Sequence, residues 1–165
     1  MNIDLKEVTS KNDLKKFIDF QYELYKENKY WVPPLKKEEL FLLSRDKNPA
    51  FDFYETKYWL AYNEDKIVGR IAGLINHKYN KKFNTKIVRF GWFDFINNNE
   101  VSSALLKAVE DWGKEKGMNL VNGPLGFTDM DGEGTLIEGF DELSTIGSIY
   151  NYEYYPELIE KNGYE

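Results

Sequence analysis

The sequence predicts one α/β (α+β) domain, residues 1–165, in which helices flank a mixed and largely antiparallel central sheet. Three observations lead to this expectation. The chain has 165 residues and 42% hydrophobic content, enough to bury one core. Five segments have the composition of strands and four others are expected to be helices, two of which repeat apolar residues at helical spacing. Three strand segments follow one another without an intervening helix, which is typical of antiparallel pairing.

The first quarter of the chain predicts one strand followed by two helices. Residues 3–8 alternate apolar and polar side chains, as a half-buried strand does. Ser10 has the position of an N-cap, and Asp13 lies three residues later as its capping-box partner. The apolar residues that follow at helical spacing predict a helix over 11–27. After a pair of prolines, which cannot continue that helix, a short helix is expected over 36–44.

The middle of the chain predicts three consecutive strands. Segments 58–62 and 67–75 are rich in aromatic and branched residues and are joined by the polar turn 63–66, so we expect a hairpin. A third strand is expected over 86–95, where Gly91 is free to adopt a bulge or a kink.

The last third predicts a helix, a short strand and a final helix. Three asparagines at 97–99 offer N-caps for a helix with one apolar face, and Gly117 is a natural stop for it. A strand at 120–121 ends at a Gly-Pro pair, and the last helix is expected over 154–161.

Composition excludes several classes of function. The net charge is −6 and the basic residues are scattered among acids, so no basic stripe predicts binding to nucleic acid. No apolar run approaches the roughly 20 residues that span a bilayer, and the first residues do not resemble a leader, so we expect no membrane association. The absence of cysteine excludes disulfides and thiolate chemistry and fits a cytoplasmic protein.

A glycine-rich acidic segment invites comparison with a calcium loop. Asp129, Asp131, Glu133 and Gly134 match positions 1, 3, 5 and 6 of an EF-hand. Position 12 must be a bidentate glutamate, but it is Phe140 here, which argues against calcium. The segment also lacks the Gly-Lys-Ser/Thr ending of a phosphate loop. We therefore expect a bend that glycine permits, with solvated or capping acids.

We expect no metal site elsewhere in the sequence. His77 is the only histidine, and no nearby pair of acids has the spacing of a ligand set. The sequence favours a surface position for it at the end of a strand.

Three stretches carry a family resemblance: 61–71 in the hairpin, 158–164 in the last helix, and 123–131 after the short strand. With the order of elements, they resemble the GNAT (Gcn5-related) N-acetyltransferase superfamily over nearly the whole chain. The stretch 123–131, with 138–141 and 150–156, is similar to a group of uncharacterised GNAT-like bacterial proteins that continue where this chain stops. The resemblance implies that the last strand of the family fold is missing. Either the chain is an N-terminal portion of a longer protein, or a homodimer partner or another domain covers the open sheet edge.

The resemblance implies transfer of an acetyl or other acyl group from acyl-CoA to an amine. In such folds the pantetheine pairs with the exposed edge of a strand, and the pyrophosphate rests on amides at the following helix start. By position, the residues assigned to acyl-CoA are Phe93, Phe95 and Ile96 on the strand and Asn98, Ser102 and Ser103 at the helix start.

One departure from the family pattern leaves two hypotheses open. The family usually begins this helix with Gln or Arg, two residues, Gly, one residue, then Gly or Ala. Residues 96–104 contain neither glycine. The first hypothesis is an N-acyltransferase, and the alternative is a degenerate, non-catalytic GNAT-like domain that binds a ligand or a partner.

The resemblance also suggests catalytic residues. Asp94 lies on the acyl-CoA strand and is a candidate general base, although a solvated strand residue is the alternative. A tyrosine of the last helix often protonates the leaving thiolate in this family. Alignment places Ile159 at that position. Tyr155, or Tyr154 beside it, lies about one turn earlier and can substitute only if the helix is shifted.

The expected acceptor is a small-molecule amine or a peptide amine. Trp31 follows the first helix and is a candidate for lining its groove, with packing onto the core as the alternative. Asp129, Asp131 and Glu133 follow the strand that lines the acyl cleft, so their carboxylates are candidates for contacting a cationic amine.

Overall fold

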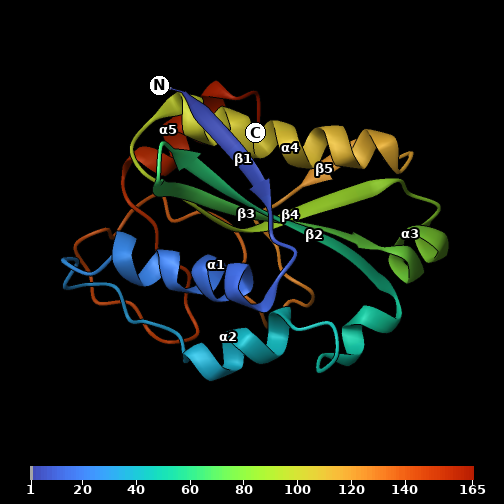
Figure 1. Ribbon diagram of the computed structural model, residues 1–165, viewed down its shortest axis with the longest axis horizontal. Helices are drawn as coiled ribbons and strands as arrows, with labels where there is room; N and C mark the ends of the chain where they lie inside the picture. Colours follow the sequence, from blue (N-terminus) through green and yellow to red (C-terminus); the bar gives the residue numbers. More distant parts are fainter. Residues whose placement is uncertain (1) are drawn as a thin grey trace.

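A computed structural model describes residues 2–165 and contains a five-stranded sheet in the order β1-β2-β3-β4-β5 (Figure 1). The strands are β1 (Ile3–Glu7), β2 (Tyr54–Asn63), β3 (Lys66–Asn76), β4 (Ile87–Phe95) and β5 (Leu120–Asn122). The first three pairings are antiparallel, and β4 pairs with β5 in parallel. The predicted mixed, largely antiparallel sheet is therefore confirmed.

The helices predicted from the sequence are all present. They are α1 (Lys11–Leu24), α2 (Lys36–Leu43), α4 (Asn99–Glu115) and α5 (Tyr154–Lys161). The Ser10 hydroxyl accepts from the Asp13 amide at 3.1 Å, and the Asp13 carboxylate accepts from the Ser10 amide at 3.3 Å, which confirms the capping box. None of the helices in residues 2–165 has both the length and the apolar character that crossing a membrane requires.

Several boundaries differ from the prediction. Two short elements were not predicted, because one or two turns are too short to show an apolar period. They are α3 (His77–Phe83) and the 3₁₀ helix η1 (Pro49–Asp52). Strand β2 begins at Tyr54 instead of residue 58, and α1 ends at Leu24 instead of residue 27. His77 is the first residue of α3, where it lies exposed with Nε2 3.3 Å from Glu55 Oε2.

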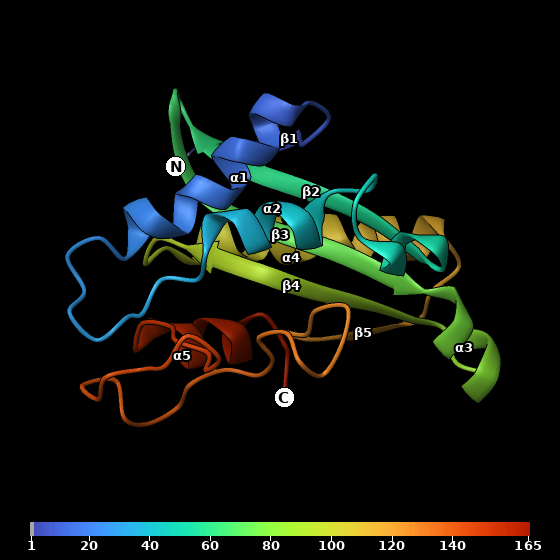
Figure 2. The same cartoon turned by 90° about the horizontal axis from the view of Figure 1, so that it is seen from below.

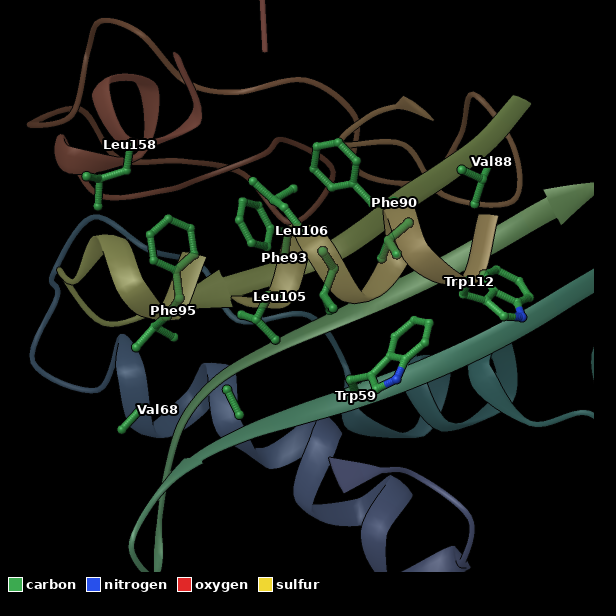
Figure 3. Close-up of a cluster of buried hydrophobic side chains, with 14 of the residues drawn as sticks. Trp59, Val68, Val88, Phe90, Phe93, Phe95, Leu105, Leu106, Trp112 and Leu158 are labelled. Atoms are coloured by element: carbon green, nitrogen blue, oxygen red, sulfur yellow. The ribbon is translucent and has the colours of Figure 1, made fainter. Parts of the chain in front are cut away.

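Helices cover both faces of the sheet. Helix α4 lies against one face, and α1 with α2 lies against the other (Figures 1 and 2). The larger core forms between the sheet, α4 and α5, where aromatic side chains of β4 point toward α4 (Figure 3). Phe90, Phe95, Leu105 and Val109 are fully buried there. A second core, around Phe17 and Leu60, lies under α1.

Strands β4 and β5 separate soon after they begin to pair. Their register joins only 87–89 to 120–122, and one further bond follows, from the Leu125 amide to the Phe90 carbonyl at 2.7 Å. Beyond this point, α5 and the irregular segment 123–153 lie beside β4 (Figure 2). The segment approaches closely because Gly91 and Gly123 have no Cβ: a Cβ at Gly123 would lie 2.4 Å from the Phe90 carbonyl oxygen.

The first testable prediction concerns this close approach. Gly123→Ala should lower the free energy of unfolding by about 1–3 kcal/mol, because the added methyl group meets backbone that cannot move aside. Urea unfolding measures the effect. Gly132→Ala is the matched control, since a Cβ there meets nothing within 4 Å, and it should change stability by less than about 0.5 kcal/mol. Equal effects of the two substitutions would contradict the prediction.

Candidate functional site

A cavity of about 290 Å³ opens where β4 leaves β5. Its wall is formed by α1, α2 and β4 on one side and by the irregular segment 123–153 on the other. The lining side chains include four carboxylates and no lysine, arginine or histidine. The carboxylates are Glu38, Glu39, Asp94 and Asp131. We call this space the acidic cavity.

A bulge in β4 shapes the wall of the acidic cavity. Arg70 pairs with Asp94 and Ala72 pairs with Gly91, so two residues of β4, Trp92 and Phe93, lie opposite one residue of β3. The bulge was expected at Gly91, but the residue with positive φ (45°) is its neighbour Trp92. A tryptophan in this conformation is strained, and such strain is concentrated at functional sites.

The Trp92 side chain reaches α2 and binds a carboxylate there. Its Nε1 donates to Glu39 Oε2 at 3.0 Å, and Gln21 Nε2 of α1 donates to the same oxygen at 3.3 Å. Glu39 is 8% exposed, and burial raises the pKa of its carboxyl group despite the nearby charge of Arg70 and the two donors. Glu39 is thus a buried acid at the cavity wall whose direct partners are neutral.

The position of Glu39 at the cavity was not predicted from the sequence. Helix α2 reverses the usual placement of polar and apolar side chains at two positions: Glu39 is buried and Phe41 is 48% exposed. The sequence of α2, Lys-Lys-Glu-Glu-Leu-Phe-Leu-Leu, does not reveal this orientation. Its four apolar residues suggest that they face the core and that both glutamates face solvent.

Asp94 lies at the same wall, but both of its oxygens are engaged. Arg70 Nε and Nη2 each donate to Asp94 Oδ2 at 2.7 Å, and Arg70 is 2% exposed. Asp94 Oδ1 accepts from the hydroxyls of Tyr25 at 3.2 Å and Tyr155 at 3.4 Å. The expectation of a solvated strand residue is wrong, because Asp94 is buried; its role as a general base remains a prediction.

Tyr155 joins α5 to the edge of β4. Its hydroxyl accepts from the Phe95 amide at 3.1 Å and lies 3.0 Å from the Tyr25 hydroxyl oxygen, while the Tyr154 hydroxyl donates to the Phe95 carbonyl at 2.6 Å. Burial, and next the charge of Asp94, raise the pKa of Tyr155 well above its usual value. Tyr155 is therefore a neutral phenol that retains its proton, as the predicted role of acid requires.

The groups assigned to acyl-CoA have intramolecular partners in this conformation. Besides the Phe95 contacts, the Asn98 side chain accepts from the amides of Glu100 at 2.8 Å and Val101 at 3.3 Å. Ser102 is fully buried, and its hydroxyl accepts at 3.2 Å from the side chain of Asn162, the C-cap of α5. Phe93 and Phe95 are buried, whereas Ile96 and Ser103 are partly exposed. In this conformation the main-chain groups of Phe95 and the side chains of Asn98 and Ser102 are therefore already engaged within the chain.

The predicted acceptor residues are only partly brought together. Trp31 and Asp131 line the acidic cavity, and Trp31 packs on Tyr25 with ring centroids 5.2 Å apart. Asp129 and Glu133 are exposed and lie outside the lining. Asp131 Oδ2 also accepts from the Thr128 amide at 2.9 Å, which is the capping role expected for acids at this bend.

Comparison with known proteins points to one family. The chain matches the model of the acetyltransferase (GNAT) family over residues 18–123. It is 36% identical to Protein YghO of Escherichia coli (strain K12) over 94% of this chain and 40% of that protein. It is 28% identical to the bacterial ceramide synthase of Caulobacter vibrioides (strain NA1000 / CB15N) over 99% of this chain and 43% of that protein. The chain spans about two fifths of the length of these curated relatives.

Solved structures share the fold at low identity. The aminoglycoside acetyltransferase AAC(6')-Iy, in complex with a CoA-based bisubstrate analogue, has a TM-score of 0.60 and 14% identity, and the match covers 100% of this chain and 92% of that one. A tandem GNAT protein from the clavulanic acid biosynthesis pathway has a TM-score of 0.64 and 11% identity, and the match covers 98% of this chain and 43% of that one. The predicted resemblance is thereby confirmed for the fold.

Proposed function

The chain belongs to the GNAT acetyltransferase family, and on this premise we propose that it transfers an acyl group from acyl-CoA to an amine bound in the acidic cavity. The observation that carries the proposal is the charge of the cavity, whose lining includes four carboxylates and no basic side chain. Such a wall attracts a protonated amine, and Trp31, Trp92 and Tyr25 add aromatic surface that suits a cation.

Glu39 is the general base that this site supports best. An ammonium group must lose a proton before its nitrogen can attack a thioester, and Glu39 accepts it without first breaking an ion pair. The nitrogen then forms a bond to the acyl carbon, the carbon–sulfur bond breaks, and the sulfur leaves as a thiolate. Asp94 contributes a fixed negative charge, and the Tyr155 phenol is a candidate donor of the proton that neutralises the thiolate. The nitrogen loses its second proton to become a neutral amide, and this proton restores the phenol that has protonated the thiolate.

We propose further that the amine carries an apolar arm. Met130 and Ile146 line the cavity and are 88% and 59% exposed, so the rim is apolar while the interior is acidic. A ceramide is an amide of a long-chain amino alcohol, so the name of the Caulobacter relative supports an acceptor with a charged head and an alkyl chain.

The partners of Phe95 and Ser102 favour a second candidate, a GNAT-like domain that binds an amine or a protein partner without transfer. Acyl-CoA reaches the edge of β4 only if the hydroxyls of Tyr154 and Tyr155 release Phe95. The contact of Asn162 with Ser102 must open as well for the pyrophosphate to reach the start of α4. A domain that retained all these contacts would bind its ligand in the acidic cavity alone.

Titration calorimetry and a thiol-release assay distinguish the two candidates. The chain is titrated separately with acetyl-CoA, hexadecanoyl-CoA, sphinganine and neamine, and acyl-CoA is then mixed with each amine. Binding of both substrate classes together with amine-dependent thiol release supports the enzyme. Amine binding with no acyl-CoA binding supports the non-catalytic domain, and failure of the folded chain to bind any amine overturns both.

A charge variant locates the amine. Asp131→Asn should weaken amine binding about twofold to fivefold, because it removes one partly exposed charge from the cavity wall while keeping an acceptor for the Thr128 amide. Asp129→Asn is the matched control from the same segment, since Asp129 lies outside the lining. Equal weakening by both variants would show that the amine responds only to overall charge.

A further inference from the structure

A second hollow lies on the far side of the contact between α1 and α2 from the acidic cavity. It has a volume of about 580 Å³ and is bounded by the turn after β1, α1, α2 and the residues that follow α2. No residue lines both hollows. We call the second hollow the basic groove.

The floor of the basic groove is apolar. Ile18, Leu43 and Tyr58 form its buried part, at 3%, 2% and 8% exposed. Leu14 and Leu40 extend this apolar surface toward solvent, where Leu40 is 38% exposed. A floor of this kind favours an alkyl chain over a polar ligand.

The rim of the groove is basic in a chain whose net charge is −6. Five lining side chains are lysine or arginine, and two are aspartate. Lys36 forms an ion pair with Asp19, and Arg45 donates to the Thr56 carbonyl at 3.4 Å. Lys11, Lys15, Lys47 and Arg45 form no ion pair with any carboxylate of residues 2–165. Four positive charges at the rim therefore have no carboxylate partner within 4 Å, and three of them are lysines.

We propose that the basic groove binds a long-chain fatty acid anion, with its alkyl chain on the apolar floor and its carboxylate among Lys11, Lys15 and Lys47. The charges identify the head group as an anion, and the uncharged floor identifies the rest of the ligand as hydrocarbon. This site is separate from the acidic cavity, so it does not depend on the proposed acyl transfer. A hollow of about 580 Å³ has room for one alkyl chain, whereas the broad surface of a bilayer does not enter it.

Calorimetry with sodium dodecanoate, below the concentration at which it forms micelles, tests the proposal on the 165-residue chain. Affinity should rise about twofold to fourfold for each methylene group from octanoate to dodecanoate, because each adds buried apolar surface. The neutral detergent dodecyl maltoside should bind at least tenfold more weakly. Binding that ignores chain length, or that is equal for the neutral detergent, overturns the proposal.

Two pairs of variants place the ligand. Combined replacement of Lys11, Lys15 and Lys47 by glutamate should weaken dodecanoate binding about thirtyfold. The same change at Lys66, Lys81 and Lys82 alters the net charge equally at exposed positions outside the groove and should have little effect. Leu40→Asp should also weaken binding, whereas Phe41→Asp, on the same helix but outside the lining, should not.

The remaining outcomes also bear on the proposal. Circular dichroism and thermal unfolding must show that each variant is folded. Equal weakening by the two lysine triples would mean that dodecanoate senses only net charge, which overturns the assignment to the groove. Sedimentation with phosphatidylcholine vesicles containing phosphatidylserine, in the absence of binding to free dodecanoate, would replace the fatty acid with a membrane surface as the occupant.

Discussion

Replacing Arg70 by methionine is expected to lower the free energy of unfolding by about 3–5 kcal/mol. Arg70 is 2% exposed, and two of its nitrogens donate to Asp94 at 2.7 Å. A third nitrogen donates to the Phe17 carbonyl at 2.9 Å, so the guanidinium joins α1 to the sheet. Methionine would fill much of the volume but leave the Asp94 carboxylate buried with only two phenol donors. Urea unfolding measures the loss.

Two further variants separate the charge from the packing. Arg70→Lys keeps the positive charge but loses the planar guanidinium with its several donors. The free energy of unfolding of this variant should therefore lie between those of wild type and Arg70→Met. The double variant of Arg70→Met with Asp94→Leu removes both charges and should be more stable than the sum of the single effects by at least about 1 kcal/mol. Strictly additive effects would show that Arg70 does not stabilise the fold through Asp94.

The fold could be predicted because its signals are local. The capping box at Ser10, the polar turn at 63–66 and the glycine stop at 117 each fix the end of an element within a few residues. Three strands in succession then leave antiparallel pairing as the simple arrangement. Helix α3 was missed because its signals, the Asn76 cap and the left-handed Asn84, surround only two turns.

The candidate site could be predicted only in part, because tertiary packing assembles it. Asp94, Tyr155 and Trp31 were chosen from the sequence, and the structure brings them to one cavity. The bulge that turns Trp92 toward α2 depends on the register between β3 and β4, which no single strand encodes. The missed signal was Arg70, since a charge within the apolar stretch 67–75 implies a buried partner.

Glu39→Gln is expected to lower the rate of acyl transfer about 10²-fold to 10⁴-fold, while amine binding weakens only about twofold to fivefold, as for the loss of one other charge of the wall. The amide still occupies the site of the carboxylate between Gln21 and Trp92, but it cannot take a proton from the ammonium group. The rate of thiol release under saturating substrates measures the effect. Glu38→Gln is the matched control, because Glu38 also lines the cavity but is exposed.

The same substitution should stabilise the protein at neutral pH, which distinguishes a carboxylate that serves as a catalytic base from one that holds the fold together. Burial raises the pKa of Glu39, so the folded state binds more protons than the unfolded state between the usual pKa and the raised one. The free energy of unfolding of the wild type therefore falls relative to that of Glu39→Gln as the pH rises through this window. The melting temperature of the variant should exceed that of wild type at pH 7 by about 2–4 °C for each kcal/mol gained in the free energy of unfolding. This difference should vanish at low pH. A variant that is less stable than wild type at pH 7 would show that the carboxylate itself holds α2 against Trp92, and would remove the reason for assigning its burial to catalysis.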